Sequence, residues 1–129
     1  MALRDPSDKV LLRMEARRFS GRCDAQVSLI ERADTLREVS RLATLINLPY
    51  SIAEEDTARD ALRVMRMRAE DRARELIQEQ IQNFLRAEEN QRDKQKRAMI
   101  DAWTNLTGPL GHLRTWAQNK LNAAGQQNG

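Results

Sequence analysis

The chain has 129 residues, of which 40% are hydrophobic and 32% are charged, and its formal net charge is +3. This length fits one domain with a modest core. Aromatic residues make up only 4% of the chain, and there are five glycines and three prolines. Such a composition argues against a β-sandwich or barrel, whereas the abundant Ala, Leu, Arg, Glu and Gln favour helices. The composition therefore predicts an all-α fold.

Basic and acidic side chains are interspersed along most of the chain. Residues 1–50 carry nine basic and seven acidic groups, and residues 51–105 carry eleven and twelve. The basic balance by itself therefore does not indicate a polyanionic partner. Cys23 is the only cysteine, which excludes an intrachain disulfide and suits a reducing compartment. With no signal-peptide pattern and no long apolar run, we expect a soluble, intracellular protein, located in the cytoplasm and away from membranes.

The first two predicted helices lie at residues 8–20 and 24–47. Asp5-Pro6-Ser7 resembles a helix entry, and Gly21 is a plausible stop. The second helix has apolar residues at steps of three and four, from Leu29 to Ile46. It ends before Pro49, because proline disfavours helical geometry in the preceding residue.

A very long helix, at about residues 52–106, is the main predicted element. The stretch from Ser51 to Leu106 contains no glycine or proline, and Ser51 with Glu54 matches a capping box. Residues 86–97 contain only one apolar side chain, so a continued helix is favoured there and a local break is the alternative. A last helix is expected at residues 110–123. The prediction is an elongated bundle of about four helices, with one domain at 1–124 and a disordered tail at 125–129.

The apolar stripe at residues 62–84 and the apolar patch at residues 98–103 of the long helix form the first candidate site, because the second half of this helix lacks a cover. Few other segments of the chain are available to cover this half, so self-association or a helical protein partner would complete it. The candidate partner-binding residues are Leu76, Ile77, Ile81, Phe84, Met99 and Trp103.

Arginines supply a second candidate site, for an anion or a nucleic acid. The long helix carries a row of arginines within about 80° of one another on a helical projection, and the first helix carries three more. Arginine suits phosphate and carboxylate groups, but its stem also covers core edges while its head pairs with nearby acids. The candidates are Arg13, Arg17, Arg18, Arg59, Arg63, Arg66 and Arg74.

Metal, cofactor and nucleophilic chemistry have little support in the sequence. His112 and Cys23 are the only residues of their types, too few for a zinc site within one chain. No glycine-rich phosphate loop occurs. We therefore expect no metal, no cofactor and no catalytic residues.

One enzyme family shares a short pattern with this chain. Asp56-x-x-Arg59-Asp60, followed by Gln91, Gln95 and Trp103, resembles the pattern of all-helical chorismate mutases. The resemblance implies an enzyme that binds a dicarboxylate among arginine, lysine and glutamine groups. That family has a lysine about nine residues before the aspartate, where this chain has Asn47, and a glutamate where it has Asp60.

These patterns lead to three functional predictions. The first is a non-enzymatic assembly, adaptor or structural accessory protein that acts through helix–helix contacts and self-association. The second is a helical protein that associates with nucleic acid through an arginine-rich face. The third is the mutase-like enzyme.

Overall fold

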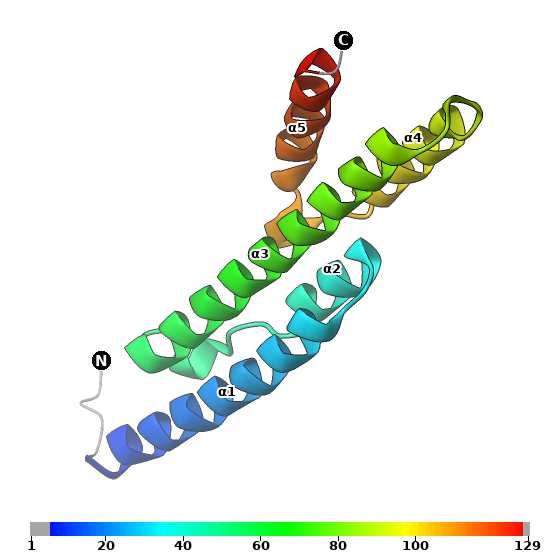
Figure 1. The fold of residues 1–129 in the computed structure, drawn as a ribbon. Coiled ribbons are helices and arrows are strands. Elements are labelled where there is room, and N and C mark those ends of the chain that lie inside the picture. The colour runs from blue at the N-terminus through cyan, green and yellow to red at the C-terminus, as the bar shows by residue number, and fades with distance from the viewer. Residues whose placement is uncertain (1–5, 128–129) are drawn as a thin grey trace.

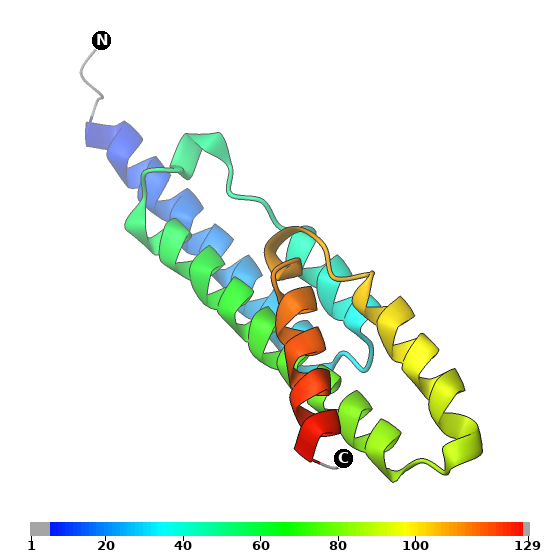
Figure 2. The ribbon, with the colours of Figure 1, turned by 90° about the horizontal axis from the view of Figure 1, so that it is seen from above.

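The computed structural model describes residues 6–127, with the side chains of residues 8–125. This part of the chain is helical, which confirms the predicted all-α class. In chain order its elements are α1 (Pro6–Arg32), α2 (Leu36–Thr44), the 3-10 helix η1 (Tyr50–Ile52), α3 (Asp56–Arg86), α4 (Glu89–Trp103), the 3-10 helix η2 (Gly108–Leu110) and α5 (Leu113–Gln127). The helices α1 and α3 lie side by side and run in the same direction, and α2 runs back against both (Figure 1). The helix α4 folds back along the C-terminal half of α3, and α5 crosses α3 (Figure 2).

The first helix is longer than predicted, because it continues through Gly21. Its core residues Ala16, Phe19, Cys23 and Ile30 keep helical spacing across this glycine and are all buried. A glycine inside a helix costs about 1 kcal/mol relative to alanine, and packing against α3 outweighs that cost. The predicted division at residues 21–24 is therefore wrong.

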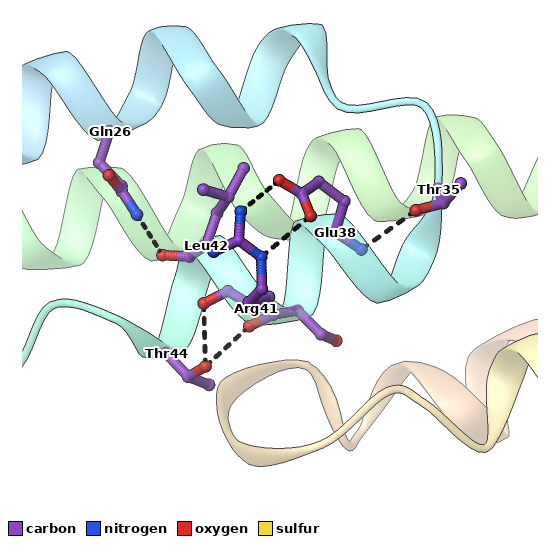
Figure 3. A network of polar contacts seen from close by, with 7 residues as sticks. Gln26, Thr35, Glu38, Arg41, Leu42 and Thr44 are labelled. Carbon is purple, nitrogen blue, oxygen red and sulfur yellow. Dashed lines mark hydrogen bonds and ion pairs between the residues drawn. The ribbon is translucent and has the colours of Figure 1, made fainter.

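The break between the first two helices lies instead at residues 33–35. Thr35 caps α2, since its hydroxyl oxygen accepts a hydrogen bond from the Glu38 backbone N–H at 3.1 Å (Figure 3). The Gln26 side-chain amide of α1 donates to the Leu42 carbonyl at 2.8 Å, which ties α2 back onto α1. The helix ends at Thr44, whose hydroxyl donates to the carbonyls of Ser40 and Arg41.

The start of α3 also differs from the prediction. Ser51 lies in η1, and α3 begins only at Asp56, with Glu55 at the N-cap position and no side-chain cap. The Glu55 N–H donates to the Ile52 carbonyl at 3.0 Å, a turn that replaces the predicted capping box. The Ser51 hydroxyl instead lies 3.5 Å from a Glu15 carboxylate oxygen, next to the N-terminal half of α1.

The predicted single helix at 52–106 is two helices, so the local break is the correct alternative. Ala87 and Glu88 are extended, with ψ near 149° in both, and α4 then returns along α3. An ion-paired polar segment stabilises a continuous helix only weakly, whereas the reversal buries Met99 and Trp103. The Trp103 indole N–H also donates to the Gln80 amide oxygen at 2.9 Å, which fixes α4 to α3.

The segment between α4 and α5 fills the centre of the molecule. Leu106 and Leu110 of this segment, with Leu113 at the start of α5, are fully buried in the same apolar cluster as the cores of α1, α2 and α3. Gly108 has φ +55°, a left-handed conformation that favours glycine. The predicted last helix is confirmed as α5. It extends to Gln127, and residues 128–129 of the predicted tail lie outside the described residues.

Candidate functional site

Most of the predicted partner-binding residues lie in the core. Leu76, Ile77 and Ile81 of α3 are buried, as are Met99 and Trp103 of α4, while Phe84 is half-buried. The antiparallel return of α4, together with α5, covers the part of α3 that the sequence left without partners. These side chains therefore stabilise the folded chain and do not form a free interaction surface.

The arginine row on α3 lines an open cavity of about 370 Å³. Arg59, Arg63 and Arg66 lie on successive turns beside the apolar side chains of Leu48, Leu62 and Met67, and Glu70 also contributes to the lining. Guanidinium groups beside apolar side chains suit an anion that has an apolar part.

Acidic neighbours reduce the positive charge of this cavity. Arg59 pairs with Asp56, and Arg63 lies 3.7 Å from Asp60. Arg74 lies 3.5 Å from Glu70, and its guanidinium also stacks over the Trp116 ring. Within the described part of the chain, Arg66 has no ion pair. The row is thus mainly a paired, core-covering set of arginines.

The outer face of α1 has a different character, with exposed apolar side chains among exposed arginines. Val10, Leu11 and Met14 are 54%, 57% and 43% exposed. Arg13, Arg17 and Arg18 surround them on the side of the helix that faces away from the core, and all three are exposed. We call these six residues the α1 surface.

The charge around the α1 surface is strongly one-sided. Residues 9–22 contain five basic side chains and one acidic side chain, Glu15. Among residues 8–125, none of these five basic groups has an ion-pair partner within 4.0 Å. Over residues 1–50 as a whole, basic and acidic side chains nearly balance. The excess of basic side chains is visible in the sequence only when residues 9–22 are counted by themselves.

An acidic surface lies beside the α1 surface at the same end of the molecule. Tyr50 in η1 is 96% exposed, and Glu54 and Glu55 follow it. We call these three residues the acidic corner; they line a small cavity of about 150 Å³. A second cavity of about 310 Å³, lined by Asp8, Leu11, Leu12 and Ser51, lies between the acidic corner and α1. The sequence pattern indicated a helix-start role for Glu54 and no functional role for Glu55 or Tyr50.

The residues of the mutase resemblance do not converge. Arg59 lies at the start of α3 and pairs with Asp56. Gln91 and Gln95 lie on α4, which begins beyond the far end of α3, about 40 Å along the helix from Arg59. The cavity at Arg59 is lined by α3 side chains and Leu48, without either glutamine.

The other chemistry-bearing residues have structural surroundings. Cys23 is buried in the core, and burial raises the pKa of its thiol, with the Asp24 carboxylate adding to the effect. His112 is exposed, with its Nε2 atom 3.4 Å from a Glu70 oxygen. Within residues 8–125, no three histidine, cysteine or acidic side chains cluster closely enough to hold a metal ion. The helices of residues 6–127 are each too short or too polar to cross a bilayer.

A comparison with known proteins finds no matching family model, no matching curated protein and no matching solved structure.

Proposed function

We propose that this protein is a non-enzymatic helical assembly protein, which self-associates through the α1 surface. The observation that carries the proposal is the exposed apolar group of Val10, Leu11 and Met14, surrounded by arginines that have no ion-pair partner among residues 8–125. Burying such apolar side chains contributes about 25 cal/mol per Å² of area removed from water. Arginine is also among the residues enriched in interface hot spots. An intracellular, cytoplasmic location is part of this proposal, since it suits the free thiol of Cys23.

The charge of the α1 surface restricts what it binds. Two α1 surfaces placed face to face would bring like charges together without compensating acids, which is unfavourable. The complementary surface is therefore acidic, with apolar side chains that cover Val10 and Met14. Association through such a surface weakens as salt concentration rises, because exposed charges are screened.

The double variant Val10→Asp with Met14→Asp tests this proposal. It replaces the apolar centre of the α1 surface with carboxylates, and we expect it to be monomeric under conditions where the wild type associates. The control is Val64→Asp with Met67→Asp, which changes the same residue types at similar exposure, 42% and 52%, on α3. Sedimentation equilibrium measures the mass, and circular dichroism verifies that helicity is retained. A wild type that stays monomeric, or a Val10→Asp/Met14→Asp variant that associates like the control, would refute the proposal.

Nucleic-acid binding is the second candidate function, because Arg13, Arg17 and Arg18 share one exposed face and form no ion pair with the described side chains. Phosphate contacts require only such cations, whereas single-strand binders add aromatic side chains for stacking. The α1 surface has aliphatic residues in that place, which favours protein over nucleic acid. Fluorescence anisotropy with labelled single- and double-stranded oligonucleotides separates the two functions. Binding that weakens steeply with salt would support this candidate, and no binding at low salt would remove it.

A further inference from the structure

We infer that the acidic surface recognised by the α1 surface is the acidic corner of a second copy of this chain, in a two-fold symmetric dimer. This inference rests on the proposed function and names the partner of the same surface. The acidic corner has the complementary properties: two carboxylates, Glu54 and Glu55, without ion-pair partners among residues 8–125, and the aromatic side chain of Tyr50.

In a two-fold symmetric dimer, each copy contributes both its α1 surface and its acidic corner to the interface, so the two surfaces must lie near each other on one chain. The Ser51 hydroxyl lies 3.5 Å from a Glu15 oxygen, so η1 adjoins the N-terminal half of α1. Figure 1 shows both elements at the same end of the molecule, away from α5. In a two-fold dimer, the α1 surface of each copy can therefore meet the acidic corner of the other, which gives two identical contacts. This arrangement pairs arginines with glutamates in both contacts.

The cavity between the two surfaces suits the exposed aromatic ring. Its volume is about 310 Å³, and Leu11 and Leu12 contribute apolar side chains to its lining. A cavity of about 150 Å³ is sufficient to hold a benzene ring. The Tyr50 ring of one copy therefore fits beside Leu11 and Leu12 of the other, with its hydroxyl near the polar side chains of Asp8 and Ser51. Tyrosine is enriched among interface hot spots for this combination of apolar body and polar tip.

Charge reversal tests the inference directly. One variant carries Arg17→Glu with Arg18→Glu on the α1 surface, and the other carries Glu54→Arg with Glu55→Arg on the acidic corner. Each alone places like charges in both symmetric contacts, so we expect dimerisation to weaken by at least about tenfold. An equimolar mixture restores opposite charges in both contacts and forms a heterodimer. A chain with all four changes forms a homodimer again.

Two further variants complete the experiment. Tyr50→Ala should weaken the dimer without changing helicity, because Tyr50 contributes little to the folded chain at 96% exposure. The control Arg86→Glu with Arg97→Glu reverses two exposed arginines that have no ion pair within the described chain, and it should leave the dimer unchanged. Sedimentation equilibrium at low salt gives the mass of each variant and of the mixture.

The outcomes separate this inference from the function it deepens. A mixture that stays monomeric, or an acidic-corner variant that dimerises like the wild type, would overturn the inference. If the α1 variant is monomeric while the acidic-corner variant dimerises, the α1 surface binds another part of the second copy. The proposed function is then supported, and the inference about the acidic corner is wrong. A wild type that is monomeric at every concentration overturns both.

Discussion

Replacing Ile77 with alanine distinguishes a core residue of α3 from a partner-binding one. Ile77 is fully buried within the single chain, so truncation removes apolar contacts and leaves a cavity. Such Ile→Ala changes cost about 2–5 kcal/mol, a large part of the roughly 5–15 kcal/mol that stabilises a typical domain. With an unfolding entropy of about 2.1 cal/mol/K per residue, this chain loses roughly 7 to 18 °C in Tm.

Thermal and urea unfolding, followed by circular dichroism, measure this loss. The matched control is Ile100→Ala, which truncates the same residue type at a position that is 40% exposed. We expect the control to lie within about 0.5 kcal/mol of the wild type. The assignment of Ile77 to the core is refuted if Ile77→Ala is no less stable than the control. Loss of association in a variant with unchanged stability would instead make Ile77 a partner-binding residue.

Three further predictions concern local features. Gly21→Ala should raise the free energy of unfolding by about 1 kcal/mol, because α1 is helical at this position and nothing lies within 4 Å of the added Cβ; a loss of stability would mean that α1 is interrupted there. Thr35→Ala should lower it by about 1 kcal/mol through loss of the cap on α2, and unchanged stability in urea would contradict that cap. The pKa of Cys23 is raised by burial, so its contribution to stability is complete below the ordinary thiol value of 9.0 and is lost as the pH rises through the raised pKa. Urea unfolding should therefore be measured below pH 9.0 and again well above it. The wild type should lose stability relative to Cys23→Ala at the higher pH, and parallel pH profiles of the two proteins would contradict this.

The sequence was a good guide to helical content but a poor one to helix ends. Ala58, Leu62, Met65 and Ala69 recur at steps of three and four in the sequence, and this helical spacing corresponds to the buried stripe of α3. The capping pattern at Ser51–Glu54 failed, whereas the same pattern at Thr35–Glu38 supplies the real cap. A local pattern is satisfied by several segments, and tertiary packing selects among them. The reversal at Ala87 likewise depends on burying Met99 and Trp103 against a segment far away in the sequence.

The candidate site was predictable in part. Arg13, Arg17 and Arg18 were candidates because the first predicted helix carries all three, and the structure shows them exposed, without ion-pair partners within the described chain. Their association with exposed Val10 and Met14 required knowledge of which face of α1 packs on α3. The proximity of the acidic corner was not predictable, since it depends on the return of the chain from α2 to the start of α1.

The mass of the wild-type protein in solution tests the central claim most directly. Sedimentation equilibrium over a wide range of protein concentration, at low and high salt, gives this mass independently of shape. The proposed dimer predicts a mass that rises with concentration at low salt toward twice the 14.9 kDa of one chain, and that falls back as salt is added. A mass of 14.9 kDa at every concentration at low salt would contradict self-association through the α1 surface.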